Sequence, residues 1–265
     1  MWHNFATLLR YRGLIQSLVA RELKARYRGS VLGFFWSFVN PLLLLSIYSF
    51  VFAKIMPPNA NAQTTPYEVF LFCGLLPWTW FSASLLEGSG ALISGGNLIK
   101  KVLFPAEILP IVSVLANMVH FALGLLILAG FMIWRQHFPD WNQIAWFPVI
   151  VFVQLIFTVG LVLLLSALTV HFRDLKDLLA NLLTFWFFAT PIIYSYKMDT
   201  VAQFARLFDW NPFFHFAVSY QELLFFQGDF GHLKWLPVMF TGSMIMFFAG
   251  YWLFDRLRDS FAEAV

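Results

Sequence analysis

A cluster of cations stands directly before a long uncharged stretch near the start of the chain. Arg21, Lys24, Arg26 and Arg28 fall within eight residues, and residues 31–53 contain no charge. A helix of this length crosses the hydrocarbon core of a bilayer, which is about 30 Å thick. Each cation would cost on the order of 3 kcal/mol at the bilayer centre. We therefore expect the four cations to stay on the cytoplasmic side and to fix the direction of the first span.

The composition extends this interpretation to the whole chain. The 265 residues are 60% hydrophobic and 12% charged, with a mean hydropathy of +0.72, whereas a soluble domain has about 25% charged residues. A chain with so few charges could not cover its own surface in water, which predicts an all-α integral membrane protein. Because Cys73 is the single cysteine, an intrachain disulfide and a cysteine-pair zinc site are excluded, and we expect no metal site.

The order of apolar and polar stretches predicts a single transmembrane domain over residues 1–265. An amphipathic helix over residues 4–28 is expected to lie in the membrane interface, where it also serves as an orientation anchor. Residues 197–234 are too polar and broken to cross, and two short helices at 201–208 and 213–226 are expected to enter the membrane only partly. Six stretches are predicted to span: 31–53, 67–93, 107–133, 148–171, 178–196 and 235–254.

The cations support six spans with both termini in the cytoplasm. In that topology twelve of the 17 lysine and arginine residues lie inside and five lie outside, as the positive-inside rule requires. The five outside are Lys54, Arg135, Lys197, Arg206 and Lys234. Because the cations gather at the ends of spans, the formal net charge of +3 gives no reason to expect a nucleic-acid partner.

Several kinds of chemistry are missing from the sequence. It contains neither the G-x-x-x-x-G-K-[ST] phosphate-binding sequence nor the H-E-x-x-H zinc sequence, so we expect neither ATP hydrolysis through a P-loop nor a metalloprotease site. Charges inside the predicted spans, which would mark an ion-coupled carrier, are nearly absent. Glu87 and Glu107 flank the first internal loop, where Lys100 and Lys101 are near enough to pair with them. The chain is therefore expected to take its driving energy from another polypeptide.

The first internal loop, residues 94–106, has the pattern of a short helix. Asn97 is suited to cap it, Pro105 would end it, and Leu98, Val102 and Leu103 give it an apolar side. A helix this short needs a docking surface to be stable. That surface is either another protein or the lipid headgroups.

Aromatic residues are unusually frequent, with 33 phenylalanines and 11 tryptophans. Several lie in or near the first, second and fifth predicted spans. Sugar rings present C–H faces that stack on aromatic rings, so such rings could line a path for a glycan. The alternative for each ring is ordinary packing together with the interfacial aromatic belts.

Six segments, in order along nearly the whole chain, resemble one known family. They look like the membrane subunits of polysaccharide ATP-binding-cassette exporters, the type-2 permeases that move O antigen, teichoic acid or capsule. The segments are RELKARYRGSVLGFFWSFVNPLLLL (21–45), CGLLPWTWFSASL (73–85), NLIKKVLFPAEILPI (97–111), HFRDLKD (171–177), TPIIYS (190–195) and WNPFFHF (210–216).

The resemblance implies a specific architecture and specific partners. It implies a cytoplasmic coupling helix at residues 95–104 and extracytoplasmic gate helices at residues 197–230. Two permease copies would join two P-loop ATPase subunits, which bind ATP and magnesium, so this chain itself would carry no cofactor. The complex would lie in the bacterial inner membrane and export a glycan carried on undecaprenyl diphosphate.

The same resemblance implies roles for individual residues. Arg21, Lys24, Arg26 and Arg28 would hold the interface helix and meet the lipid diphosphate, since arginine pairs well with phosphate oxygens. The residues that would dock on the ATPase are Asn97, Leu98, Ile99, Lys100 and Lys101. The candidates for lining the glycan channel are Trp36, Tyr48, Trp78, Trp186 and Tyr194. No catalytic residue is implied.

Two other functions remain open from the sequence. The chain could be a related type-2 permease for a drug or a simple lipid. It could also be a membrane-embedded enzyme acting on polyprenyl phosphate, which would need clustered acidic residues at a membrane face. The pairs Asp174/Asp177 and Asp255/Asp259 come nearest to such a cluster, although each also fits a solvated helix end.

Overall fold

A computed structural model describes residues 11–55, 64–96, 105–141, 143–198 and 203–264. Every regular element in these ranges is helical, which confirms the predicted all-α class. Five helical segments are long and apolar enough to cross a membrane: Gly33–Phe52, Tyr67–Ser89, Ile108–Arg135, Ile144–His171 and Gly231–Phe261. They correspond to the first, second, third, fourth and sixth predicted spans.

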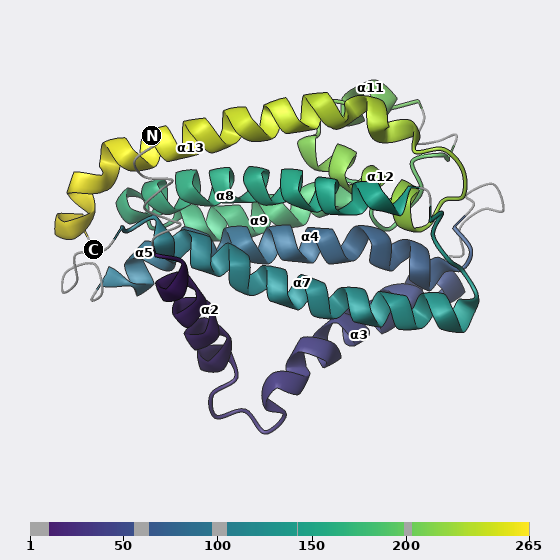
Figure 1. Cartoon of the computed structure of the whole chain (residues 1–265), viewed down its shortest axis with the longest axis horizontal. Helices are drawn as coiled ribbons and strands as arrows, with labels where there is room; N and C mark the ends of the chain where they lie inside the picture. Colours follow the sequence, from purple (N-terminus) through teal and green to yellow (C-terminus); the bar gives the residue numbers. More distant parts are fainter. Residues whose placement is uncertain (1–10, 56–63, 97–104, 142, 199–202, 265) are drawn as a thin grey trace.

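The bundle is built from long helices that run back and forth between two ends (Figure 1). One end, which we name the α5 end, holds the short helix α5, the start of α2 and the end of α13. The other, the α12 end, holds α11 and α12. The elements are α2 (Arg12–Arg26), α3 (Trp36–Ser49), α4 (Tyr67–Ser89), α5 (Ala91–Ser94), α7 (Ile108–Arg135), α8 (Phe147–His171), α9 (Leu175–Phe188), α11 (Ala205–Phe208), α12 (Pro212–Leu224) and α13 (Leu236–Ala264).

Helix α4 forms the centre of the bundle. Most of its residues are buried, because it contacts α7, α8, α9 and α12. Helix α3 is peripheral, with only Ser37 and Leu45 buried, and it is preceded by the 3-10 turn Gly33–Phe35 and followed by the π-helical turn Phe50–Ile55. In Figure 1, α2 and α3 diverge on one side of the bundle while α13 runs along the opposite side.

The fifth predicted span is shorter than expected. We predicted residues 178–196, but α9 ends at Phe188 after 14 residues, or about 21 Å. Pro191 explains this end, because a proline disfavours the helical conformation of the residue before it. A helix of this length does not cross about 30 Å of hydrocarbon by itself, so six complete spans are not confirmed.

The segment between α9 and α13 contains short helices, as its polarity predicted. Helix α11 covers Ala205–Phe208 and α12 covers Pro212–Leu224, compared with the expected 201–208 and 213–226. Nearly every residue of α12 after Pro212 is buried against α4, α8 and the 3-10 turn Gly231–Trp235. Helix α12 is thus an interior part of the fold, whereas Phe204, Leu207 and Trp210 in and around α11 are exposed. The gate role of this segment stays a prediction.

The last helix continues well beyond its predicted end. We expected a span at 235–254 followed by a short tail, whereas α13 runs to Ala264. The added turns keep an apolar face, and Phe254 and Phe261 are each only 1% exposed. Most of the tail thus continues the helix beyond the predicted span and keeps one apolar side.

Helices α8 and α13 approach each other until their backbones touch. A Cβ atom on Gly250 would lie 2.0 Å from the carbonyl oxygen of Gly160, and a Cβ on Gly160 would lie 2.6 Å from Cα of Phe247. Small residues permit this close approach, which provides much of the packing energy between helices in lipid, where the hydrophobic effect between them is weak.

Replacing Gly250 with leucine should force α8 and α13 apart. The substituted side chain would overlap backbone atoms that cannot rotate away, so we expect a destabilisation of at least about 1–3 kcal/mol. The measurement is thermal unfolding of the purified protein in detergent. Gly242→Leu on the same helix is the control, because nothing lies within 4 Å of its Cβ position; equal losses for the two variants would contradict the close contact.

Candidate functional site

A cavity of about 430 Å³ opens between α2, α3, α4 and α7. Its volume lies in the range of about 300–1,000 Å³ that is usual for small-molecule sites. The cavity exists because α2 and α3 diverge, which leaves the outer faces of α4 and α7 uncovered between them (Figure 1). Its walls are formed by Arg26, Tyr27, Ser30, Trp36, Ser37, Asn40, Pro41, Leu44, Phe72, Leu75, Leu76, Thr79, Trp80, Ala83, Asn117, His120 and Phe121.

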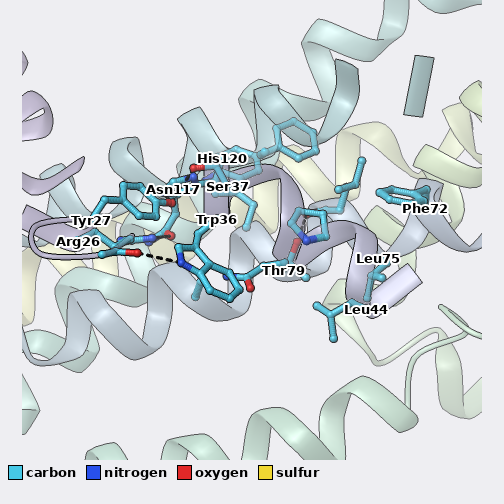
Figure 2. Close-up of a pocket in the computed structure, with 17 residues that line it drawn as sticks. Arg26, Tyr27, Trp36, Ser37, Leu44, Phe72, Leu75, Thr79, Asn117 and His120 are labelled. Carbon is cyan, nitrogen blue, oxygen red and sulfur yellow. Dashed lines mark hydrogen bonds between the residues drawn. The ribbon is translucent and has the colours of Figure 1, made fainter. Parts of the chain in front are cut away.

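The cavity is polar at one end and apolar at the other (Figure 2). At the polar end the Tyr27 hydroxyl lies 2.6 Å from Ser37 Oγ and 3.4 Å from His120 Nε2. At the other end Leu44 and Leu75 present only hydrocarbon. This gradient suits a ligand with a polar head and an apolar chain.

The four predicted lipid-phosphate cations occupy different environments. Arg26 reaches the cavity wall, but its guanidinium donates to Glu87 Oε2 at 2.5 Å and to Asn117 Oδ1 at 3.1 Å. Arg21, Lys24 and Arg28 are exposed to the surroundings of α2 and the turn after it. Three of the four cations are therefore free of ion pairs in the described part of the chain, and their role toward a lipid phosphate stays a prediction.

The predicted coupling residues, Asn97 to Lys101, lie outside the described residues. The structure does describe both arms of the α4–α7 connection, which we define as residues 90–106. Helix α5 forms the first arm, with Leu92 fully buried, and residues 105–106 lead into α7. Both described arms lie at the α5 end (Figure 1).

The two carboxylates that flank this connection have partners that the sequence did not indicate. We expected Lys100 and Lys101 to be near enough to pair with them. In the structure Glu87 binds Arg26 and the Asn117 side chain, and Glu107 forms an ion pair with Arg258 of α13. No local pattern identifies these partners, because they come from distant parts of the chain.

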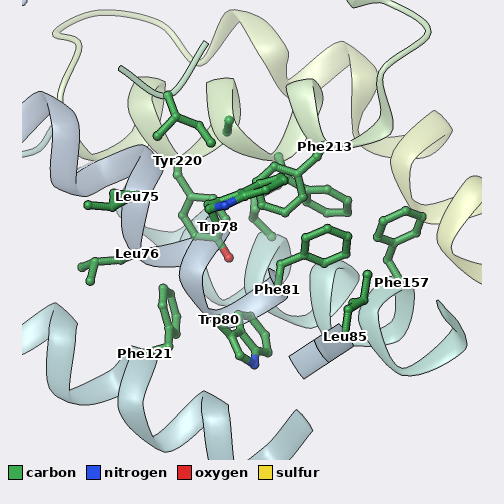
Figure 3. Close-up of a cluster of buried hydrophobic side chains, with 14 of the residues drawn as sticks. Leu75, Leu76, Trp78, Trp80, Phe81, Leu85, Phe121, Phe157, Phe213 and Tyr220 are labelled. Atoms are coloured by element: carbon green, nitrogen blue, oxygen red, sulfur yellow. The ribbon is translucent and has the colours of Figure 1, made fainter. Parts of the chain in front are cut away.

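The predicted channel aromatics fall into two groups. Trp78 is only 5% exposed and contacts Trp186, with 6.1 Å between ring centroids, and Phe213 at 4.9 Å. Tyr48 joins the same group through Phe187, whose centroid lies 5.8 Å away. Figure 3 shows Trp78 inside this packed cluster, next to Phe81 and Phe213. Within one chain the ring of Trp78 therefore contributes to the core.

The other two predicted channel aromatics lie elsewhere. Trp36 lines the cavity and donates from Nε1 to Ser30 Oγ at 3.0 Å. Tyr194 follows α9 and donates its hydroxyl to the Phe188 carbonyl at 3.0 Å. The structure does not bring Trp36 and Tyr194 into one surface with the Trp78 group, and the predicted glycan path stays a prediction.

Asn211 organises the start of α12, and the sequence analysis did not single it out. Its Oδ1 accepts from the backbone N–H groups of Phe213 and Phe214 and from Trp186 Nε1 at 2.7 Å, while its Nδ2 donates to the Ala189 carbonyl at 3.2 Å. Asparagine followed by proline is a known signature of a helix start, so the cap itself was detectable. The contacts to the end of α9 were not.

The described residues offer no cluster of potential metal ligands. No group of three histidine, cysteine, aspartate or glutamate side chains there could hold a metal ion. The four aspartates considered for polyprenyl phosphate chemistry are exposed, and Asp255 lies 3.9 Å from Arg258. Asp174 and Asp177 lie at the start of α9, and Asp255 and Asp259 lie on the exposed side of α13.

Comparison with known proteins gives one family and several relatives. The sequence profile of the family described as ABC-2 type transporter matches residues 13–225. The chain is 40% identical over 260 residues, 97% of each chain, to the O-antigen export system permease protein RfbA of Myxococcus xanthus. It is 30% identical over 250 residues, 94% of each chain, to the protein of the same name from Klebsiella pneumoniae. It is 23% identical over 214 residues to the polysialic acid transport protein KpsM of Escherichia coli, covering 76% of this chain and 77% of that protein.

Replacing Asn211 with alanine should loosen the junction between α9 and α12. The change removes a helix cap, worth about 1 kcal/mol, and leaves the half-buried Trp186 N–H without its partner, which costs about 1–3 kcal/mol. Asn211→Ser restores the cap alone and should fall between alanine and the native residue. Thermal unfolding measures these effects, with the exposed Asn181→Ala on α9 as control; an Asn211→Ala variant as stable as the control would contradict this role.

Proposed function

The chain belongs to the ABC-2 type transporter family, and from this premise we propose that it is the permease subunit of an ATP-driven polysaccharide exporter. The observation that carries the proposal is the 40% identity to an O-antigen export permease across 97% of both chains. Similarity that extends over whole chains is what two proteins with the same architecture and the same transported class would have. The sequence also lacks a P-loop, so ATP is hydrolysed by a separate subunit that binds magnesium with its nucleotide.

The proposed topology has six crossings with the α5 end in the cytoplasm. Helix α8 ends at the α5 end and α13 begins at the α12 end (Figure 1), so the chain must cross once more between them. Helix α9 and the turns that follow it supply this crossing in our proposal. The excess of cations at the ends of the spans nearest α5 supports a cytoplasmic location for that end, in a bacterial inner membrane.

We assign ATPase docking to residues 95–104. The described arms on either side of them lie at the α5 end (Figure 1), which the proposed topology places in the cytoplasm. Asn97, Leu98, Ile99, Lys100 and Lys101 are the proposed contacts.

A second copy of the chain is the proposed partner of α9. Leu178, Leu182, Phe185 and Phe188 follow one side of this helix and are between 52% and 73% exposed. A short helix with a wide uncovered apolar face gains stability from another protein surface, and a second α9 related by two-fold symmetry offers a matching one. Two permeases with two ATPases would complete the exporter.

The cavity is the proposed binding site for the lipid carrier on the cytoplasmic side. Its apolar end would take part of the hydrocarbon chain, and Arg21, Lys24 and Arg28 stand near enough in sequence to its polar end to attract a diphosphate. The carrier in this proposal is undecaprenyl diphosphate. The glycan itself would follow a path near Trp36, Tyr48, Trp186 and Tyr194, and Trp78, which packs against Trp186 in the core, would hold that ring in place.

Two experiments test the proposal. The tagged chain is expressed in its own host and purified, and in a separate strain its gene is deleted. The chain should copurify with a P-loop ATPase, in a complex whose mass fits two copies of each subunit. Cells without the gene should accumulate lipid-linked glycan on the cytoplasmic side. Intact glycan export in the deletion strain, together with lost tolerance to a drug or a changed lipid distribution, would instead support the alternative cargo.

Replacing Lys100 and Lys101 together with glutamate tests the docking assignment. Reversal of two charges should weaken the contact with the ATPase. A loss of about 1.4 kcal/mol in binding free energy lowers the affinity tenfold, so export should fall by at least about tenfold. The thermal stability of the permease itself should not change. The matched control is Lys54→Glu, because Lys54 is exposed and lies on the predicted outer side. Unchanged export in the double variant would remove the docking assignment while leaving the permease function intact.

A further inference from the structure

Two carboxylates bracket the α4–α7 connection, and each binds a different peripheral helix. Glu87 lies in the last turns of α4, before the connection, and Glu107 directly precedes α7, after it. Any displacement of the connection therefore acts on these two positions first. The partners of the two side chains show which helices would feel that displacement.

Glu87 connects the first arm to α2. Its Oε2 atom accepts from Arg26 at 2.5 Å and from Asn117 Nδ2 at 2.6 Å, and Arg26 also donates to Asn117 Oδ1 at 3.1 Å. The three side chains thus form a closed triangle between α2, α4 and α7, which we name the α2 joint. Hydrogen bonds that involve ionised groups are about twice as strong as neutral ones, and Asn117 is only 3% exposed.

The first half of helix α2 packs on the start of α7. Leu18 packs on Ile108 and Val112 of α7 in a small apolar cluster that is separate from the main core. The α2 joint lies at the opposite end of the helix, at its last residue, Arg26. Because the cluster holds one end and the joint holds the other, a shift of Glu87 changes the tilt of α2.

Glu107 connects the second arm to α13. The carboxylate is 2% exposed and forms an ion pair with Arg258, which we name the α13 joint. A buried carboxylate that loses its cation is left with an uncompensated charge, which is strongly unfavourable. Arg258 therefore moves together with Glu107, and the cytoplasmic turns of α13 move together with Arg258.

The arms themselves are stiff enough to transmit movement. Helix α5 contacts both α7 and α8, and its Leu92 is fully buried. Gly95 lies so close to Leu109 that a Cβ atom there would come within 2.4 Å of the leucine side chain. A dense contact of this kind moves as a unit rather than absorbing a displacement.

We propose that Arg26, Glu87 and Asn117 on one arm, and Glu107 and Arg258 on the other, are positioning residues that transmit ATPase-driven movement. The α2 joint passes a displacement of the connection to α2, and the α13 joint passes it to α13. The inference rests on the proposed function in one respect, namely that an ATPase docks on this connection. It adds the route by which docking reaches the rest of the permease.

The α2 joint also links the connection to the cavity. Arg26 and Asn117 belong both to the joint and to the cavity wall, and Tyr27 follows Arg26 directly. Tilting α2 moves this part of the wall relative to α4 and α7. ATP turnover would thereby change the shape of the polar end of the cavity, and a ligand at that end would in turn act on Glu87, because coupling between two sites is reciprocal.

The experiment follows each helix separately in the purified complex of permease and ATPase. Cys73 is buried, so a cysteine introduced at the exposed position Ala20 or Asp259 can carry an environment-sensitive fluorophore on α2 or α13. ATP with vanadate should shift the emission of both labels in the otherwise native complex. Glu87→Gln should abolish the shift at residue 20 and keep the shift at residue 259, and Glu107→Gln should do the reverse.

Both glutamine variants keep the size and shape of the side chain, so they are expected to fold and assemble. Glycan exported per ATP hydrolysed should fall about 5- to 150-fold in each, the range typical of coupling between sites. Arg258→Lys retains the cation and should restore part of the coupling lost in Arg258→Gln. Arg256→Gln is the matched control, because Arg256 is exposed on the same helix and stacks on Trp252.

The possible outcomes separate this inference from the proposed function. If no ATPase copurifies with the chain, the proposed function fails and the inference fails with it. If the complex hydrolyses ATP but neither label responds, or if both glutamine variants leave both shifts and the export ratio unchanged, the inference alone is overturned. Equal loss of both shifts in either variant, with reduced thermal stability, would mean that the joints only hold the fold together.

Discussion

The absence of water in the bilayer core governs the whole structure, because every backbone N–H and C=O group there needs a partner within the protein. Hydrogen bonds within helices satisfy most of these groups. Where a helix ends inside the bundle, buried side-chain amides donate hydrogen bonds to the free backbone carbonyls. Gln221 donates to the Pro191 carbonyl at 2.8 Å, and Asn211 donates to the Ala189 carbonyl at 3.2 Å. The irregular segment after α9 can lie inside the bundle because side chains from α12 and its cap cover its backbone.

Both ends of the bundle have ion pairs, including Arg135 with Glu68 at the α12 end, but the α12 end adds bonds between its loops. At the α5 end, side-chain ion pairs connect the α4–α7 connection to α2 and α13, and ion pairs can separate and form again as helices move. At the α12 end, side chains bind backbone carbonyls across two loops: His137 to Phe225 at 2.8 Å, Gln227 to Phe138 at 2.7 Å, and Gln143 to Gly228. These bonds hold the end of α12 to the loop between α7 and α8. The arrangement fits a permease that is driven at the α5 end while α12 moves together with its neighbours.

The cavity links these features to transport. It exists because α2 and α3 separate around a turn, and its polar end shares Arg26 and Asn117 with the α2 joint. One group of residues therefore borders both a possible ligand and the route toward the ATPase. In an exporter whose ATPase is a separate polypeptide, such a shared wall would let the presence of cargo influence ATP use.

The sequence by itself determined the all-α membrane class, the approximate limits of five long helices and the family, because apolar length, charge placement and family motifs are all local in the chain. Tertiary structure decided the rest. It paired Glu87 with Arg26, 61 residues away, and Glu107 with Arg258, 151 residues away, where the sequence had suggested the nearby Lys100 and Lys101. It buried Trp78 among other rings and extended α13 to Ala264. A side chain in a membrane protein pairs with the group that helix packing places beside it. Packing depends on which faces of the helices meet, and hydropathy and residue spacing do not specify those faces.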